Sequence, residues 1–326
     1  MKFKNVCITS NVRVLFLYLL YRDDNVLEDT FFFIDKIPDS IAENLPNKKE
    51  LRLKPSLINN LYLSILIRFW RIFQYPFIRK AYFYGQDNIP LSKVIYPHSN
   101  MTLIEDGLLS YFYVPQPKKI QNFLIIRKLF NVNIRKSELF GRSQQVKKIL
   151  MTNLFPIPSD IQNKVELIDV GKLWNESSET KKQLILNIFN FSYDDFRFLS
   201  GYKEILLTQP LSEDGAISES EKIEMYKKMI GSRKVVVKPH PRENTDYSKY
   251  IPNSVILKKH VPIELYSVLG VEFETAYTIF STAVYMIPKI KTIVFVGTKN
   301  YPKLSSFYGD ISYESGMLIG QLSVPK

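Results

Sequence analysis

Cysteine, histidine and glycine are scarce in this sequence, which has one cysteine, three histidines and 12 glycines among 326 residues. The single cysteine, Cys7, excludes an internal disulfide framework and the paired-cysteine patterns of zinc sites, and it fits a reducing compartment. The few glycines form neither a Walker loop nor a GxGxxG loop. We therefore expect a cytoplasmic protein without a glycine-rich phosphate-binding loop.

Metal-ligand patterns and long apolar runs are missing as well. The acidic pairs at residues 23–24 and 194–195 are adjacent rather than in DxD spacing, so the sequence predicts neither a metal site nor another cofactor. No apolar run reaches the roughly 18 residues that a membrane-spanning helix needs. We expect a protein that does not cross the membrane.

The chain carries a formal net charge of +12, which is typical of proteins with polyanionic partners. Residues 60–84, "NLYLSILIRFWRIFQYPFIRKAYFY", combine aromatic and basic side chains and are compatible with a helix. Two interpretations stay open: an amphipathic segment on the anionic inner face of the cell membrane, or a core helix with arginines at its rim. Zinc-finger, RRM and basic-tail patterns are missing, so we predict no nucleic-acid partner.

Strand-like and helix-like segments alternate along the chain, a pattern that favours parallel sheets with helices on both faces. At 326 residues the chain is long enough for two domains. We predict an α/β protein with two doubly wound, Rossmann-like domains, residues 1–160 and 161–326. The domains are expected to face each other across a cleft, with ligands at the carboxyl ends of the strands. Strands are expected in "KNVCITS", "TFFFID", "KVIYPH", "NFLIIR", "EILLTQP", "KVVVKPH", "SVILKK", "YTIFST" and "TIVFVG".

One histidine lies in a constrained segment, "VVVKPHPREN", residues 235–244. The β-branched run predicts a buried strand, so "KPHPRE" is expected just beyond its carboxyl end. Pro239 and Pro241 restrict the backbone around His240. An imidazole held in this way, beside a lysine and an arginine, is suited to donate a proton or a hydrogen bond to a phosphate oxygen. By itself the His-Pro dipeptide favours a rigid exposed turn in which the histidine is incidental, and only the other motifs of the chain reverse this.

The tripeptide Glu-Asp-Gly occurs twice, each time after a predicted strand. Residues 105–107 follow "VIYPHSNMTLI", in which we expect a strand and then a loop, and residues 213–215 end "LTQPLSEDG". A carboxylate beside a second carboxylate can serve as a general base whose pKa is raised by its neighbour. Because the tripeptide is also a common turn, one of the two copies could be only a turn.

In this order, the Glu-Asp-Gly and His-Pro motifs resemble the paired motifs of bacterial sialyltransferases. The segments "LTQPLSEDG" and "KPHPRE" are most similar to glycosyltransferase family 52, the lipooligosaccharide and capsule sialyltransferases. The resemblance implies the two-domain GT-B fold, with residues 1–160 on the acceptor side and residues 161–326 binding the nucleotide. It also implies an inverting, metal-independent transfer of sialic acid from CMP-sialic acid to a galactose-terminated glycan, and it allows a homodimer.

The resemblance further implies roles for single residues. His240 would contact the nucleotide phosphate and act as general acid for the CMP leaving group, and Glu264 would bind the ribose hydroxyls. Ser281 and Thr282 match a Ser/Thr pair that binds the phosphate at a helix start, where free backbone N–H groups favour anions. The nucleotide-binding residues predicted in this way are Lys238, His240, Pro241, Arg242, Glu264, Ser281 and Thr282.

Two carboxylates compete for the role of general base. Transfer with inversion needs a carboxylate that deprotonates the attacking sugar hydroxyl. Asp106 fits because it lies in the first, acceptor-side domain, and Asp214 fits because its sequence context is the more similar to the family. We take Asp106 as the first choice. Supporting roles are expected for Glu105, Gly107 and Glu213.

Two other functions stay open at the level of the sequence. One is a GT-B glycosyltransferase with a different nucleotide sugar, because the side chains that select sialic acid are not identified by the motifs. The other is a non-catalytic membrane-surface component of glycan assembly, which would dock through its basic face.

Overall fold

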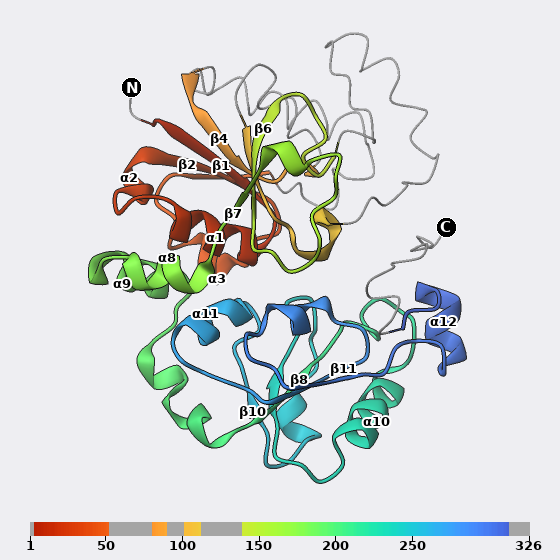
Figure 1. Cartoon of the computed structure of the whole chain (residues 1–326). Coiled ribbons are helices and arrows are strands. Elements are labelled where there is room, and N and C mark those ends of the chain that lie inside the picture. Colours follow the sequence, from red (N-terminus) through yellow and green to blue (C-terminus); the bar gives the residue numbers. More distant parts are fainter. Residues whose placement is uncertain (1–2, 52–79, 90–100, 112–138, 313–326) are drawn as a thin grey trace. The chain divides into compact units, whose positions relative to one another are not determined.

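The computed structural model describes residues 3–51, 80–89, 101–111 and 139–312. It divides into two compact units, residues 1–190 (unit 1) and residues 191–326 (unit 2), shown in Figure 1. Most of the predicted amphipathic stretch lies outside the described residues, as do the strands expected in "KVIYPH" and "NFLIIR". The last residues of that stretch belong to a strand, Tyr82–Gly85, and not to a helix.

Unit 1 contains one parallel sheet with the strand order β3-β2-β1-β4-β5-β6-β7. Strands β2 and β3 lie on one side of β1. The next strand along the chain, β4, lies on the other side of β1 and is followed outward by β5, β6 and β7. The carboxyl ends of β1 and β4 therefore flank the switch point, where sheets of this kind bind ligands. The strands are β1 (Asn5–Thr9), β2 (Thr30–Ile34), β3 (Lys48–Glu50), β4 (Tyr82–Gly85), β5 (Met101–Ile104), β6 (Val146–Met151) and β7 (Val165–Leu167).

The first helix of unit 1 is buried almost all round. Residues 14–20 have no exposed surface, and the helix contacts β1, β4 and β5 as well as helices α8 and α9. A helix with such an apolar circumference requires cover on several sides. The helices of unit 1 are α1 (Val12–Tyr21), α2 (Val26–Asp29), α3 (Asp39–Ala42), α8 (Val170–Glu176) and α9 (Glu179–Ile188).

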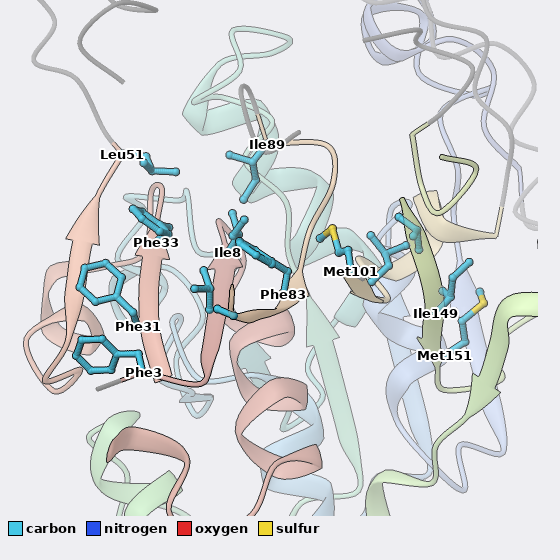
Figure 2. Close-up of a cluster of buried hydrophobic side chains, with 14 of the residues drawn as sticks. Phe3, Ile8, Phe31, Phe33, Leu51, Phe83, Ile89, Met101, Ile149 and Met151 are labelled. Carbon is cyan, nitrogen blue, oxygen red and sulfur yellow. The ribbon is translucent and has the colours of Figure 1, made fainter. Parts of the chain in front are cut away.

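A cluster of buried side chains that includes residues from β1, β2, β4, β5 and β6 forms the core of unit 1 (Figure 2). Aromatic rings dominate one end of it: Phe31 packs edge-on against Phe3 at 5.5 Å and against Phe33 at 5.2 Å between ring centroids. Such edge-to-face pairs are favourable beyond the area that they bury. The two ring pairs pack β2 against the residues that precede β1.

The boundary between the units lies after Asn190, later along the chain than the boundary predicted after residue 160. Strand β7 pairs with β6, and α8 and α9 pack against α1, so these elements belong to unit 1. The polar residues of α8 and α9 belong to the exposed faces of helices that cover the sheet of unit 1.

Unit 2 repeats the same construction with a parallel sheet in the order β10-β9-β8-β11-β12. Its switch point lies between β8 and β11. The predicted fold class, an α/β protein with two doubly wound parallel sheets, is confirmed. The elements are β8 (Glu204–Leu207), α10 (Glu219–Ile230), β9 (Val236–Lys238), β10 (Val255–Ile256), α11 (Ile263–Val268), β11 (Thr275–Thr278), β12 (Thr292–Phe295) and α12 (Pro302–Tyr308).

Short 3-10 helices complete the two units: η2 (Gly107–Ser110), η5 (Gln162–Lys164), η6 (Tyr193–Asp195), η7 (Arg197–Gly201), η8 (Tyr247–Lys249) and η9 (Thr282–Met286). Among the residues that the structure describes, no helix has both the length and the apolarity to cross a membrane.

Replacing Gly85 with alanine is expected to lower the free energy of unfolding by more than about 2 kcal/mol. Gly85 has φ 117°, and an added Cβ would lie 2.0 Å from the carbonyl oxygen of Ile8 on the neighbouring strand. Gly201 has open space around its Cα, so Gly201→Ala is the matched control, with a change within about 0.5 kcal/mol. Urea unfolding followed by circular dichroism compares the two variants, and equal changes would contradict this account.

Candidate functional site

At the switch point of unit 1, three side-chain amides surround the carboxylate of Asp106. Its Oδ1 accepts a hydrogen bond from Asn11 Nδ2 at 2.7 Å, and its Oδ2 accepts from Gln86 Nε2 at 2.6 Å and from Asn88 Nδ2 at 3.0 Å. These amides follow β1 and β4, whereas Asp106 follows β5. The sheet order brings the three loops together, and hydrogen bonds from neutral amides hold the carboxylate at both of its oxygens. We call this arrangement the amide cage.

The surroundings of Asp106 favour a carboxyl group that can exchange a proton. Burial raises its pKa above the ordinary value, and the hydrogen bonds from the three amides oppose this rise only in part. A raised carboxyl pKa strengthens the group as a base. The following residue, Gly107, has φ 63°, so the chain turns sharply just after the carboxylate.

The side chain of Glu105, unlike that of Asp106, has a structural role. Its side chain is fully buried, with Oε1 2.8 Å from Arg13 Nη2 and Oε2 accepting from Tyr111 Oη at 2.7 Å and from the Thr152 backbone N–H at 2.6 Å. These partners come from α1, from the segment after β5 and from the segment after β6. Glu105 therefore ties together the elements that carry Asp106. Strand β5 ends directly before Glu105, so the loop predicted between strand and motif is wrong for the first Glu-Asp-Gly copy.

In unit 2, the loop after β9 is held by contacts on several sides, not only by its prolines. The backbone N–H of His240 donates to Glu243 Oε2 at 2.6 Å. Lys259 Nζ donates to the carbonyl oxygen of Glu243 at 2.8 Å. His240 lies at the carboxyl edge of the sheet, as predicted, and its position depends on tertiary contacts.

The imidazole of His240 has a defined tautomer. Its Nδ1 accepts a hydrogen bond from the backbone N–H of Arg242 at 3.2 Å, so the proton of the neutral ring is on Nε2. Burial and the positive charges of Arg242 and Lys238 lower the pKa of His240 to about 4. Without a bound anion the ring is neutral near pH 7 and presents an N–H donor.

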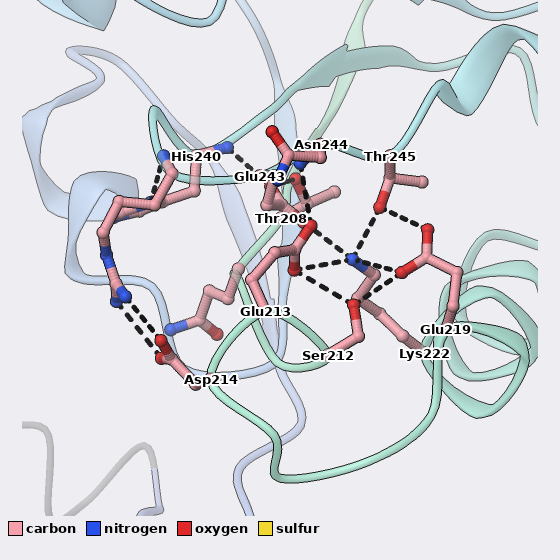
Figure 3. Close-up of polar contacts among 12 residues, drawn as sticks. Thr208, Ser212, Glu213, Asp214, Glu219, Lys222, His240, Glu243, Asn244 and Thr245 are labelled. Atoms are coloured by element: carbon pink, nitrogen blue, oxygen red, sulfur yellow. Dashed lines mark hydrogen bonds and ion pairs between the residues drawn. The ribbon is translucent and has the colours of Figure 1, made fainter.

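A buried ammonium organises this part of unit 2 (Figure 3). Lys222, on α10, has no exposed surface, and its Nζ lies 3.0 Å from Glu213 Oε2, 3.0 Å from Glu219 Oε2 and 3.6 Å from Glu243 Oε1. It also donates to Thr245 Oγ1 at 2.6 Å. Three segments of the chain, the loop after β8, helix α10 and the loop after β9, therefore meet at one charge, and we call this group the Lys222 cluster.

Glu213 and Glu243 connect the Lys222 cluster to the loops of the site. Glu213 Oε1 accepts from the Asn244 backbone N–H at 2.8 Å, and although burial raises the pKa of Glu213, this bond and Lys222 bring it to about 2. Glu243 accepts from His240, from Tyr247 Oη at 2.6 Å and from Thr208 Oγ1. Both carboxylates hold loops in place.

Asp214, the second candidate base, is engaged with a cation. Its two oxygens form a bidentate pair with the guanidinium of Arg242, and Tyr308 Oη donates to Oδ2 at 3.1 Å. The ring of Tyr308 packs against Phe280, with 4.9 Å between centroids. This arrangement positions Arg242 beside His240. Gly215, with φ 79°, makes the second Glu-Asp-Gly copy a turn as well.

The other predicted nucleotide-binding residues also lie at the carboxyl edge of the sheet in unit 2. Ser281 is the N-cap of η9, Thr282 is the first residue of η9, and both side chains are half-buried. Lys238 is buried, and its Nζ donates to the carbonyl oxygen of Lys259 at 2.8 Å. Burial lowers the pKa of Lys238 to about 7, while the nearby Glu264 on α11 acts in the opposite direction.

Several site residues were not anticipated from the sequence. Lys222 lies in an amphipathic helix pattern with many lysines, and Asn11, Gln86 and Asn88 are scattered amides with no motif. Glu243 is the last residue of "KPHPRE". Its spacing of three residues from His240 is the sequence feature that could have indicated its contact with the loop. Over the described ranges, no group of three or more histidine, cysteine, aspartate or glutamate side chains is arranged to hold a metal ion.

Comparisons with known proteins agree with this architecture. The model of glycosyltransferase family 52 matches residues 59–300. A protein of Haemophilus influenzae, described as uncharacterized, is 34% identical over 95% of this chain and 100% of its own length.

Two solved sialyltransferase structures share the fold. The GT-B domain of a sialyltransferase from Photobacterium damselae has a TM-score of 0.56 at 12% identity, covering 88% of this chain and 89% of its own. A Photobacterium 2,6-sialyltransferase, in complex with CMP and lactose, has a TM-score of 0.55 at 15% identity, covering 89% and 71%. At these identities the likeness establishes the GT-B fold.

Removing the buried ammonium is expected to destabilise unit 2. Lys222→Met leaves three carboxylates facing one another and should lower the free energy of unfolding by about 3–5 kcal/mol. Lys227→Met, on the same helix, removes a lysine whose 3.6 Å pair with Glu224 is exposed, and a loss below about 1 kcal/mol is expected. Urea unfolding measures both, and similar values for the two variants would refute the role given to Lys222.

His240 is expected to titrate near pH 4, which NMR of its ring protons can measure. Arg242→Gln should raise this pKa, because it removes a positive charge that disfavours the imidazolium. Since the unfolded chain takes up the proton near pH 6.5, the contribution of this group to stability falls as the pH drops from about 6.5 towards 4. A midpoint near 6.5 that Arg242→Gln leaves unchanged would show that the ring is not enclosed as described.

Proposed function

Because the chain belongs to glycosyltransferase family 52 and is a glycosyltransferase with the GT-B fold, we propose that it is an inverting sialyltransferase. It transfers sialic acid from CMP-sialic acid to a galactose-terminated bacterial surface glycan, a lipooligosaccharide, capsule or exopolysaccharide. One observation supports the proposal above all. At the carboxyl edge of its sheet, each unit has a titratable side chain whose position is fixed by hydrogen bonds: Asp106 in the amide cage, and His240 beside Arg242. A neighbour in fold was solved with CMP and the acceptor lactose, which ends in galactose.

Asp106 is the general base in this proposal. It removes the proton from the attacking hydroxyl of the acceptor while that oxygen forms a bond to the anomeric carbon of sialic acid on the face opposite CMP. Its raised pKa suits proton uptake. The amide donors fix the carboxylate orientation, so that one lone pair can face the hydroxyl.

His240 assists the departure of CMP. As the bond between the anomeric carbon and the phosphate oxygen breaks, negative charge grows on the phosphate. The Nε2–H of His240 can donate to that oxygen, and a nearby phosphate raises the imidazole pKa from its low value, which makes proton transfer possible.

The charge that stabilises the leaving group comes from side chains in this proposal, without a metal ion or another cofactor. Arg242 is held by Asp214, which also accepts a hydrogen bond from Tyr308 Oη, and it supplies a cation next to His240. Ser281 and Thr282 at the start of η9 supply hydroxyls, and Glu264 binds the ribose. Asp214 therefore positions Arg242 and is not the base.

Replacing the two aspartates separates these roles. Asp106→Asn keeps the side-chain size and should lower the rate of transfer from CMP-sialic acid to lactose by about 10²- to 10⁴-fold, with CMP affinity unchanged. Asp214→Asn should weaken CMP binding, because Arg242 loses its partner, and leave most of the catalytic rate at saturating donor.

Transfer, donor hydrolysis and CMP affinity are measured for both variants and for the wild type. The reverse pattern, with transfer lost only in Asp214→Asn, would make Asp214 the base. A wild-type chain that hydrolyses a UDP-sugar but not CMP-sialic acid would reject sialyl transfer and support a different donor.

A further inference from the structure

The side-chain amide nitrogen of Gln209 donates no hydrogen bond to any residue that the structure describes. The residue lies directly beyond β8, at the switch point of unit 2, and is only 8% exposed. Gln209 Nε2 is not among the fully enclosed side-chain polar atoms that lack a hydrogen bond, so it is still reachable by a solvent-sized group.

The orientation of this amide is fixed. Gln209 Oε1 accepts a hydrogen bond from the Phe280 backbone N–H at 2.9 Å, which identifies the other amide atom as the nitrogen. Its backbone N–H donates to the buried Tyr226 Oη at 2.8 Å. Both ends of the residue are therefore immobilised, and the two N–H groups of Nε2 point in set directions.

The side chain of Gln209 lies close to the predicted phosphate-binding residues at the start of η9. Phe280 immediately precedes Ser281, whose backbone N–H donates to Thr278 Oγ1 at 2.8 Å, while Thr278 Oγ1 donates to the carbonyl oxygen of Leu207 at 3.1 Å. These bonds bring the end of β8 and the start of η9 together. An immobilised amide N–H that solvent can reach, at the carboxyl edge of the sheet and beside the start of η9, is placed to donate a hydrogen bond to a ligand bound there.

We propose that Gln209 is a further donor-binding residue, whose Nε2–H group donates a hydrogen bond to an anionic oxygen of the nucleotide sugar. The phosphate next to Ser281 and Thr282 is the expected partner, and the carboxylate of the sialic acid offers the same chemistry. This inference rests on the proposed function, because it takes the donor to be CMP-sialic acid.

Gln209→Glu tests the proposal with an isosteric change. The variant retains an oxygen for the Phe280 N–H and replaces the amide donor with a charged acceptor. We expect the Kd of CMP to rise by about 10- to 100-fold and the Kd of cytidine, which lacks the phosphate, to change less than about 2-fold. If CMP-sialic acid is weakened and CMP is not, the anionic oxygen is the sugar carboxylate. Calorimetric titration measures all three ligands.

A matched control corrects for the change in net charge. Gln183→Glu makes the same substitution on α9 in unit 1, where the amide donates to Asn187 Oδ1 on the surface, and should leave all three affinities unchanged. Should Gln209→Glu unfold, the side-chain NH₂ resonance of Gln209 in the wild type serves instead: it is expected to shift with CMP and not with cytidine.

Three results would overturn the inference. Unchanged affinities in Gln209→Glu, or a loss for cytidine equal to that for CMP, would show that the amide is structural. The same holds for an amide resonance that CMP does not move. In these cases a wild type that still binds CMP leaves the proposed function standing, whereas a wild type that binds neither CMP nor CMP-sialic acid rejects both.

Discussion

The buried ammonium of Lys222 is the interaction on which the geometry of unit 2 depends. Removing a charge from water is expensive unless the charge is paired and hydrogen-bonded, and here three carboxylates and a hydroxyl surround it. Because Glu213 and Glu243 also hold the loops after β8 and β9, the requirement to satisfy one cation brings His240 and Arg242 to the same place. The loop that carries His240 is thus positioned by the ion pairs and hydrogen bonds of the Lys222 cluster.

Unit 1 holds its carboxylate with neutral donors instead of a cation. The amide cage around Asp106 keeps the carboxylate oriented, and burial keeps its pKa raised, whereas Asp214 in unit 2 is engaged by a guanidinium. The two Glu-Asp-Gly motifs are therefore alike in sequence and different in chemistry. In both, the glutamate ties loops together and the glycine makes the turn, so the two copies differ in the surroundings of the aspartate: amides around Asp106 and a guanidinium beside Asp214.

The sequence predicted the strands with continuous apolar, β-branched or aromatic runs, such as "TFFFI" and "VVK", because both faces of a central parallel strand are buried. It missed β6, "VKKILM", whose two lysines interrupt the run near the sheet edge, and β4, whose residues were part of a stretch interpreted as helical. The position of His240 followed from its strand. The amide cage and the Lys222 cluster did not, because their members come from segments far apart in the chain.

Local apolar patterns and short motifs were enough to predict the α/β class, the strands β1, β2 and β8 to β12, and the location of His240, Ser281 and Thr282 at strand ends. Tertiary structure alone decided which acidic residue has the environment of a base, because that depends on partners that lie 95 residues away for Asn11 and 28 residues away for Arg242. Hydrogen bonds and ion pairs act through space, and their partners are brought together only when the sheets form.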